Sequence, residues 1–252
     1  MTELAYLTDL PAAYVRSFRA RIVALPPGAV VLDRTYFYPT GGGQPADRGE
    51  LRLEGGAGLE VVDVTKAGPS VVHRVQGAPA AVRALAVGRD VDGTLDWERR
   101  HRHMRLHTAQ HLLSARLFTR FGLRTRRANL SGVTATLDLD GPLNDDALPP
   151  LAVDLRDAAI HPLPVHIRYV PRAEWDRNPA SERSGLVPLP RQVDPVRVVE
   201  IEATDACPCG GTHVRSTDEL GEISLAPPVP IGGGASRLAL TLVAATSVGR
   251  PA

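Results

Sequence analysis

Residues 96–118 read DWERRHRHMRLHTAQHLLSARLF, a long stretch with the apolar periodicity of a helix. Apolar residues and histidines recur at helical spacing, so we predict a helix over residues 97–117 that is ended by Gly122. Residues four apart on a helix share one face. The side chains of His107 and His111 are therefore expected to point at one spot.

A second motif, Cys209-Gly210-Gly211-Thr212-His213, offers a thiolate and a third imidazole behind a Gly-Gly turn. Three imidazole nitrogens and one sulfur make a suitable tetrahedral shell for zinc. We therefore predict one Zn²⁺ per chain, bound by His107, His111, Cys209 and His213. Cys207 could serve as a spare ligand.

The two motifs leave the role of this metal open. No Glu follows His107 as it does in the H-E-x-x-H motif of zinc proteases, which disfavours a metalloprotease. Four protein ligands are typical of structural zinc. Catalysis would then need a fifth position, a ligand that leaves, or chemistry beside the metal.

The composition is that of an ordinary globular protein with little overall charge. The chain has 252 residues, of which 43% are hydrophobic, and a formal net charge of +1. This charge gives no general basic field for nucleic acid, although it is compatible with a local patch. Cys207 and Cys209 are too close to form a disulfide framework, and the N-terminus lacks the pattern of a secretory signal. No apolar run approaches the ~18 residues of a membrane span, so we expect a cytoplasmic protein without membrane association.

Residues 1–93 are predicted to form a small β-barrel domain. Short apolar runs alternate with Gly- and Pro-containing turns, as is typical of several short strands. The expected strands cover residues 29–32, 51–53, 59–64, 70–75 and 84–87. Asp92-Gly93 is expected to be a turn near the domain boundary.

Residues 94–252 are predicted to form an α+β domain in which helices pack on a mostly antiparallel sheet. The expected elements are strands at 128–140, 165–170 and 196–201 and a helix that is capped by the Asn144-Asp145-Asp146 segment and ends near Ile160. Residues 171–195 are expected to form a short helix and an extended loop. Residues 220–225 and 237–243 are expected to form a hairpin joined by the 232–234 glycine loop.

Two further features have more than one interpretation. The Gly41-Gly42-Gly43 run beside Gln44 could bring backbone close to a ligand, but a plain hairpin loop is the commoner explanation. The arginines that surround the predicted helix form either a phosphate-binding surface or a solvated charged face. They are Arg99, Arg100, Arg102, Arg105, Arg116, Arg120, Arg124, Arg126 and Arg127.

The residues around both motifs resemble the editing domain of alanyl-tRNA synthetases. Residues 96–113 look like the start of that domain, and Asp205 with residues 209–214 looks like its second zinc-binding motif. Residues 37–49 resemble the Gly-rich segment of the barrel that precedes it. The sequence has no room for an aminoacylation domain, so it is similar to the free-standing AlaX editing proteins in their medium-length form.

The resemblance implies an enzyme that hydrolyses the ester of mischarged tRNA(Ala), chiefly Ser-tRNA(Ala), with Gly-tRNA(Ala) as a further candidate. The zinc ligands of that family correspond to His107, His111, Cys209 and His213. Gln44 and Thr108 are expected to act in catalysis. The expected substrate-binding residues are Gly41, Gly42, Gly43, Asn129, Ser131, Thr134 and Asp205. Contacts to the acceptor end of the tRNA are expected from Arg99, Arg100, Arg102, Arg105, Arg124, Arg126 and Arg127.

Because the ligand shell is full, we expect zinc to organise the substrate while a nearby water is activated. Two other functions remain compatible with the sequence. One is a zinc-stabilised tRNA-binding module without catalysis, and the other is a zinc hydrolase of a different ester or amide. We expect a monomer or a weak homo-oligomer.

Overall fold

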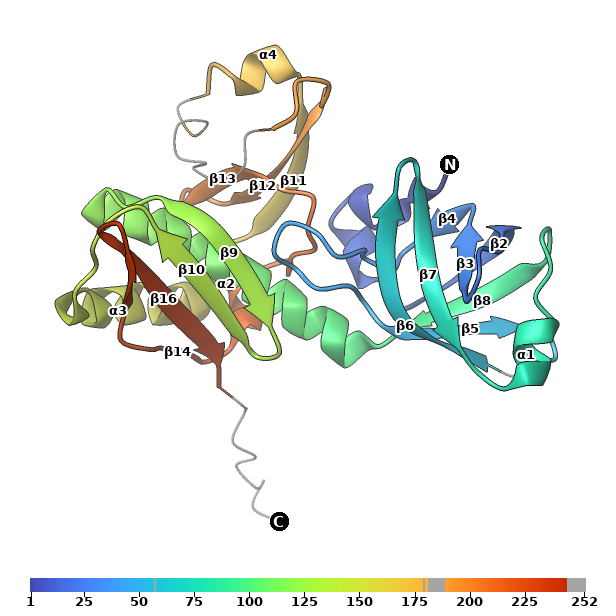
Figure 1. Ribbon diagram of the computed structural model, residues 1–252. Helices are drawn as coiled ribbons and strands as arrows, with labels where there is room; N and C mark the ends of the chain where they lie inside the picture. Colours follow the sequence, from blue (N-terminus) through green and yellow to red (C-terminus); the bar gives the residue numbers. More distant parts are fainter. Residues whose placement is uncertain (57, 179, 181–188, 244–252) are drawn as a thin grey trace. The chain divides into compact units, whose positions relative to one another are not determined.

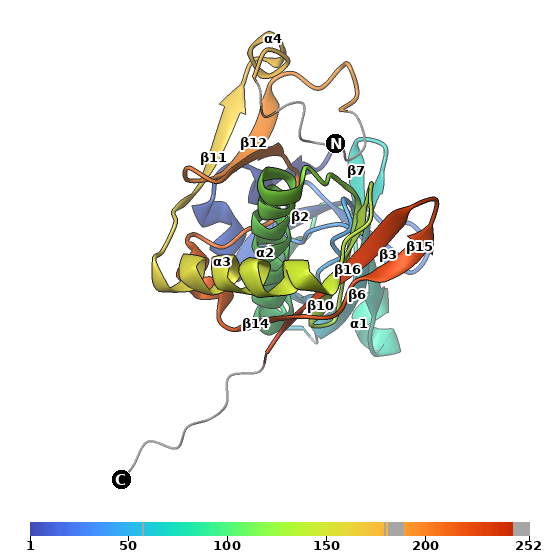
Figure 2. The same cartoon turned by 90° about the vertical axis from the view of Figure 1, so that its left-hand side faces the viewer.

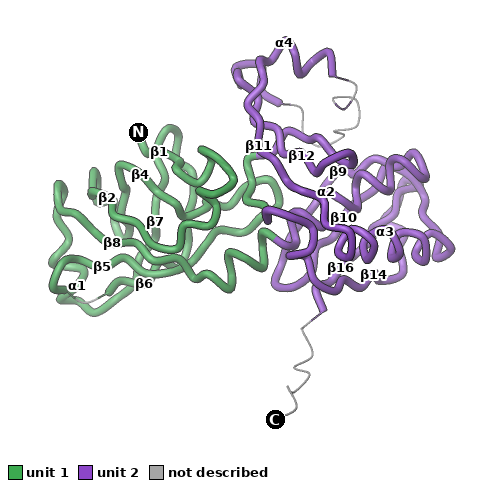
Figure 3. Tube along the Cα trace, turned by 180° about the vertical axis from the view of Figure 1, so that it is seen from behind, with its two compact units in different colours: residues 1–104, 210–213 green, residues 105–209, 214–252 purple. Residues whose placement is uncertain are grey.

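The computed structural model describes residues 1–56, 58–178, 180 and 189–243 (Figure 1). The chain divides into two compact units, which Figure 3 colours separately. Unit 1 comprises residues 1–104 and 210–213, and unit 2 comprises residues 105–209 and 214–252. Both mix strands with few helices, as the predicted α+β class requires. None of the helices in the described part of the chain is long and apolar enough to cross a membrane.

A closed barrel of six strands forms the centre of unit 1. Its strands pair in the order β2-β3-β7-β6-β5-β8, and the pairing of β8 with β2 closes the ring. These strands are β2 (Ser17–Ala24), β3 (Ala29–Leu32), β5 (Gly49–Leu53), β6 (Gly58–Ala67), β7 (Ser70–Gln76) and β8 (Asp90–Leu95). Unit 1 also contains β1 (Glu3–Leu4), β4 (Arg34–Thr35), the 3-10 helices η1 (Ala5–Leu7) and η2 (Pro11–Tyr14), and α1 (Pro79–Arg83).

Strand β8 shows how the barrel core is filled. Side chains alternate between the two faces of a strand, and Val91 and Leu95 are buried. Gly93 lies between them, and a Cβ added there would lie 2.6 Å from the Cζ atom of Phe18. The glycine therefore makes room for an aromatic ring inside the barrel.

The barrel also buries a histidine whose two ring nitrogens face neutral partners. His73 Nδ1 donates to the Val30 carbonyl at 3.1 Å, since a carbonyl can only accept. His73 Nε2 then accepts the Thr35 hydroxyl at 2.8 Å. Burial lowers the pKa of His73 to about 4, against a smaller raising effect of the hydrogen bond to Val30.

Unit 2 contains a five-stranded sheet and a separate three-stranded sheet. The first consists of β9 (Thr125–Ser131), β10 (Thr134–Leu139), β14 (Ile223–Leu225), β15 (Val229–Gly232) and β16 (Ala235–Leu242), and the second of β11 (Val165–Val170), β12 (Val196–Ile201) and β13 (Asp205–Pro208). Besides part of α2, the described helices of unit 2 are α3 (Leu148–Ile160), α4 (Arg172–Trp175), and the 3-10 turns η3 (Asp145–Ala147) and η5 (Thr217–Leu220). All strand pairs in both sheets are antiparallel.

Helix α2 (Trp97–Phe121) carries the first histidine motif, and the unit boundary falls within it between Met104 and Arg105. Figures 1 and 2 show α3 and the C-terminal part of α2 on the same side of the five-stranded sheet. The buried face of α2 includes Leu106, Leu113 and Leu117, each 0% exposed. Gly122 ends the helix with a φ of 69°, as its position predicts.

The structure corrects several predicted elements in the first half of the chain. The expected strands at 29–32, 51–53, 59–64 and 70–75 correspond to β3, β5, β6 and β7. Residues 84–87 are not a strand, because they follow α1 as a turn. Asp92-Gly93 is not a turn but part of β8, and both β2 and β8 were missed.

In the second half of the chain, the predictions are wrong mainly about which strands are joined by turns. Residues 128–140 form two strands, because Gly132 adopts a φ of 58° and turns the chain between β9 and β10. Residues 223–225 do pair with β16, but the glycine loop joins β15 to β16. No side-chain hydrogen bond from Asn144 caps the following turn. Strands β11 and β12 confirm the predictions at 165–170 and 196–201, while residues 181–188 of the predicted loop lie outside the described residues.

Candidate metal centre

His107, His111, Cys209 and His213 form the candidate metal centre. Each offers one ligand atom, and these atoms all lie within 4.8 Å of one another. Helix α2 places His107 and His111 one turn apart, with ring centroids at 5.1 Å. Cys209 directly follows β13, and its Sγ atom lies 3.5 Å from His107 Nε2.

The donor types suit zinc, and one donor separation can be compared with that of a tetrahedral shell. With a Zn–N distance of about 2.05 Å and a Zn–S distance of about 2.3 Å, a tetrahedral angle separates the two donors by about 3.6 Å. The observed separation of 3.5 Å between His107 Nε2 and Cys209 Sγ agrees with this value. His107 and His111 are each 3% exposed, so water is largely excluded from their rings.

Asp205 orients one of these ligands. Its Oδ2 atom lies 2.9 Å from His111 Nδ1, and both side chains are 3% exposed. A carboxylate on Nδ1 holds the proton there, so Nε2 is the nitrogen that can bind a metal. Asp205, predicted to bind substrate, is thus placed as a partner of a candidate ligand.

Arg197, which the sequence analysis did not single out, holds the backbone of Cys209. The Arg197 Nη1 atom donates to the Cys209 carbonyl, and the Cys209 amide donates to the Arg197 carbonyl at 3.1 Å. Arg197 is 8% exposed within β12, where four of the other five residues are apolar. A charged residue inside such a strand was the signal available in the sequence.

The Gly-rich segment forms a tight turn in unit 1. The Gly41 and Gln44 backbones exchange hydrogen bonds of 3.1 and 2.9 Å, and Gly42 and Gly43 adopt φ values of 56° and 81°. The Tyr38 hydroxyl donates to the Gly41 carbonyl at 2.7 Å. The turn therefore uses glycine for its backbone conformation, as a hairpin loop would.

Both residues nominated as catalytic are buried. Gln44 is 0% exposed, and its Nε2 atom donates to Thr212 Oγ1 at 2.9 Å. Thr108 is also 0% exposed, and its Oγ1 atom accepts the Val214 amide at 3.2 Å. Each side chain therefore contacts the segment that carries His213.

One predicted tRNA-binding residue is wrongly assigned, because Arg100 is 0% exposed. It pairs with Asp47, which is equally buried, and donates to the carbonyls of Ala13 and Tyr36. A guanidinium sealed in this way cannot reach a phosphate. Arg100 instead holds the end of the Gly-rich segment at Asp47.

The other predicted tRNA-binding residues differ in accessibility. Arg99 donates to the Ala46 carbonyl at 2.9 Å, and Arg105 donates to the Leu220 carbonyl. Burial lowers the pKa of both, although arginine remains protonated at neutral pH. Arg102 is partly buried. The exposed residues are Arg124, Arg126 and Arg127.

Three predicted substrate-binding residues lie on the β9–β10 hairpin. Asn129 and Ser131 are exposed, and the Thr134 hydroxyl lies 3.0 Å from that of Thr241. Thr134 pairs in register with Ser131, which brings these two side-chain positions together. In the described residues, no observed hydrogen bond connects the three to the candidate ligands.

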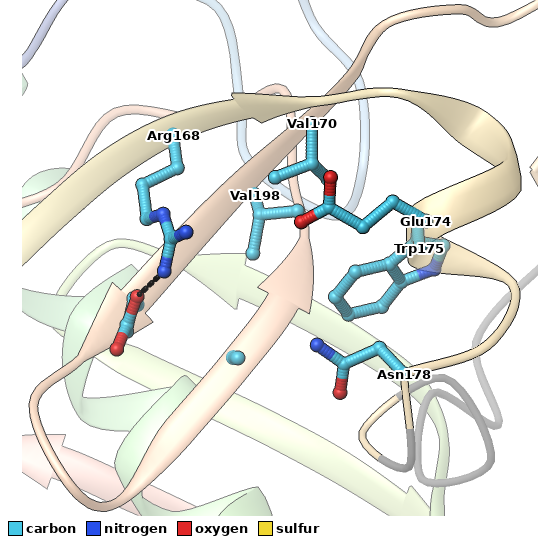
Figure 4. Close-up of a pocket in the computed structure, with 8 residues that line it drawn as sticks. Arg168, Val170, Glu174, Trp175, Asn178 and Val198 are labelled. Carbon is cyan, nitrogen blue, oxygen red and sulfur yellow. Dashed lines mark hydrogen bonds and ion pairs between the residues drawn. The ribbon is translucent and has the colours of Figure 1, made fainter.

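Unit 2 also contains a pocket of about 120 Å³, shown in Figure 4. Trp175 forms one wall, and Val170 and Val198 lie on the sheet face beside it. The rim carries charged side chains. Among them, Arg168 Nη1 lies 3.4 Å from Glu200 Oε2. None of its eight lining residues was predicted as a site residue.

Comparisons with known proteins agree with the resemblance. A family model described as tRNA synthetases class II (A) matches residues 11–99. A model described as the threonyl and alanyl tRNA synthetase second additional domain matches residues 196–237. These two ranges include the Gly-rich turn and the Cys209–His213 segment.

Relatives that match over nearly their full length identify the family more closely. The chain is 34% identical to the alanyl-tRNA editing protein AlaX-M of Saccharolobus solfataricus over 247 residues, which cover 96% of this chain and 99% of that protein. It is 32% identical to AlaX-M of Methanosarcina barkeri, covering 96% and 100%. The alanine–tRNA ligase of Pyrobaculum neutrophilum is 34% identical over 261 residues, but the match spans only 28% of the ligase. The chain therefore belongs to the AlaX-M family of alanyl-tRNA editing proteins.

Proposed function

We propose that this chain is a zinc-dependent hydrolase that deacylates mischarged tRNA(Ala), chiefly Ser-tRNA(Ala) and also Gly-tRNA(Ala). Water would add to the ester carbonyl, and the bond to the ribose oxygen would break. The products are the free amino acid and a tRNA with a free ribose hydroxyl. A barrel domain over residues 1–93 and an editing domain over 94–252 are part of this proposal.

One observation carries the proposal. A His/His/Cys/His donor set, in which the three histidines are buried, occurs in a chain that aligns over nearly its full length with proteins named for alanyl-tRNA editing. An aminoacyl ester is already activated, so a positioned water and stabilisation of charge at the carbonyl are sufficient for its hydrolysis.

His107, His111, Cys209 and His213 would hold the metal. When bound, Zn²⁺ supplies a positive centre that orients and polarises the aminoacyl group. Asp205 keeps His111 in the tautomer that binds through Nε2. Arg197 fixes the Cys209 backbone, so the thiolate needs little rearrangement to act as a ligand.

Selection of serine over alanine would come from polar side chains that hydrogen-bond the serine hydroxyl. Alanine leaves such groups without a partner, and this costs more than the loss of one neutral hydrogen bond. Asn129, Ser131 and Thr134 offer these groups on the β9–β10 hairpin. Asn129 and Ser131 are exposed and therefore available to a ligand, while Thr134 is half-buried.

The tRNA backbone would be held by the exposed arginines Arg124, Arg126 and Arg127, with Arg99, Arg102 and Arg105 in support. Arginine suits phosphate because its planar guanidinium forms paired hydrogen bonds. A phosphate-binding surface of this kind gives affinity that falls steeply with salt.

A second candidate is a zinc-stabilised tRNA-binding module without catalysis. The specific observation in its favour is the complete set of four protein donors, which is typical of structural zinc. This function predicts that zinc removal unfolds the protein, whereas the zinc-loaded protein leaves Ser-tRNA(Ala) intact.

Deacylation of Ser-, Gly- and Ala-tRNA(Ala) tests the proposal. The wild type should release serine and glycine faster than alanine. Cys209→Ala should bind no zinc. Its deacylation activity should fall by more than the ~10- to 100-fold that is typical when a residue next to a metal ligand is changed. Cys207→Ala is the matched control, because Cys207 lies outside the donor set and should tolerate the change. Absence of serine and glycine release by the zinc-loaded wild type would refute editing.

A further inference from the structure

The segment from Cys209 to Val214 carries two candidate ligands and is held at three points. Arg197 binds the backbone of Cys209 at its start. Gln44 binds Thr212, the residue before His213. Thr108 binds the amide of Val214, the residue after His213.

Gln44 makes a two-point contact with Thr212, and both residues belong to unit 1. The Thr212 amide donates to Gln44 Oε1 at 3.3 Å, and Gln44 Nε2 donates to Thr212 Oγ1 at 2.9 Å. A backbone amide can only donate, so it fixes which end of the Gln44 amide faces it. Gln44 and Thr212 are both 0% exposed, so water does not compete for these hydrogen bonds.

Thr108 makes the corresponding contact on the other side of His213. Its hydroxyl accepts the Val214 amide, and Val214 is also 0% exposed. Thr108 follows His107 directly on α2. The same short stretch of helix thus supplies one candidate ligand and fixes the residue beside another.

We infer that Gln44 and Thr108 are positioning residues, which hold the His213 backbone in place for metal binding, rather than groups that touch the substrate. This inference rests on the proposed function for its metal and reaction. Positions one residue before and one residue after His213 are fixed, so the imidazole has little freedom to leave the donor set. Outer partners of this kind tune metal affinity without contacting the metal.

The Gly-rich turn acquires a role from this arrangement. The paired backbone hydrogen bonds between Gly41 and Gln44 hold the backbone from which the Gln44 side chain extends. Tyr38 anchors the turn through its hydroxyl, and its amide donates to Asp47 at 2.6 Å. A series of contacts thus runs from the ion-paired Asp47 through the turn to Thr212. The turn would act on the metal ligands rather than on the aminoacyl group.

Zinc affinity in three variants provides the test. Gln44→Met and Thr212→Val each keep side-chain size and remove the Gln44–Thr212 side-chain hydrogen bond. Competition with a chromophoric chelator should show zinc binding weakened on the order of 10- to 100-fold in each. The double variant should bind zinc no more weakly than Gln44→Met, because that change alone already removes both hydrogen bonds between the two residues. Thr108→Val should weaken zinc binding similarly, whereas Thr108→Ser retains the hydroxyl and should restore it.

A matched control distinguishes an effect on zinc binding from a general loss of stability. Thr35→Val removes another buried hydroxyl of unit 1, and this hydroxyl contacts His73. It should lower thermal stability but leave zinc affinity and the visible spectrum of the cobalt-substituted protein unchanged. If Gln44→Met does not fold, Thr212→Val and Thr212→Ser make the same comparison with Gln44 in place.

Measurements of kcat test the alternative, in which Gln44 contacts the substrate. If Gln44 touches the substrate, Gln44→Met will lower kcat at saturating zinc while zinc affinity and the cobalt spectrum stay as in the wild type. That result would overturn the inference, as would unchanged zinc affinity in Thr212→Val. Zinc affinity is measured without tRNA, so failure of the editing proposal and failure of this inference remain distinguishable.

Discussion

Replacing Asp47 with Asn should destabilise unit 1 by about 3–5 kcal/mol, the range for breaking a buried ion pair. Arg100 and Asp47 are both 0% exposed, so neither charge can be screened by water when its partner is neutralised. The guanidinium donates through Nε to Asp47 Oδ2 at 2.9 Å, and the same oxygen accepts the Tyr38 amide at 2.6 Å. Asn keeps the shape but removes the charge that all of these donors face.

Tryptophan fluorescence can follow this unit alone. The chain has two tryptophans, Trp97 in unit 1 and Trp175 in unit 2. A Trp175→Phe background leaves Trp97 as the reporter. With a urea slope of about 2 kcal/mol per molar, the unfolding midpoint should fall by roughly 1.5–2.5 M in Asp47→Asn.

Two further variants decide whether the ion pair is the cause. Arg21→Met breaks an exposed pair with Asp90 on the same barrel and should barely move the midpoint, because water screens it. Asp47→Asn combined with Arg100→Met removes both charges and should cost less than the sum of the single changes. A midpoint shift in Asp47→Asn as small as that in Arg21→Met would refute the reasoning.

The remaining predictions concern pH, the metal and RNA. The unfolded state takes up a proton at His73 below pH ~6.5 and the folded state only near pH 4, so unit 1 should lose about 3 kcal/mol as pH falls through this window. Urea unfolding at several pH values should show this loss, and His73→Gln should lack it. Asp205→Asn should weaken zinc binding on the order of 10- to 100-fold by chelator competition, and equal affinity would contradict the orientation of His111 by a carboxylate. Arg126→Gln with Arg127→Gln should lower the salt slope of tRNA binding by about 1 for each phosphate that is no longer neutralised, and an unchanged slope would mark these arginines as solvated charge.

The helix that carries the first motif was predictable because its signal is local. The spacing of His107 and His111 depends only on helix geometry, and α2 contains both. The same holds for β3 and β7, whose apolar runs stand between turn residues. Such elements need no information from the rest of the chain.

Strand β8 was missed because its signal is not local. Gly93 follows Asp92 and therefore reads as a turn, yet Phe18 from another strand fills the space above it. The contact of Gln44 was not predictable for a similar reason, since its partner Thr212 lies 168 residues away. The sequence identifies the chemical type of each residue here, whereas its role depends on contacts between distant segments.

Asp205 also matters for the charge of the candidate centre. A zinc ion with one thiolate and three neutral imidazoles carries a net charge of +1 by formal counting. The Asp205 carboxylate on His111 reduces this sum to zero. Except for Cys209, the candidate ligands and Asp205 are almost fully buried. A neutral centre costs less to bury than a cationic one, and it does not repel the positively charged α-amino group of an aminoacyl ester. The carboxylate therefore combines two effects, tautomer control and charge balance. Asp205→Asn should lose both, whereas a change that only misplaces the His111 ring would lose the first alone.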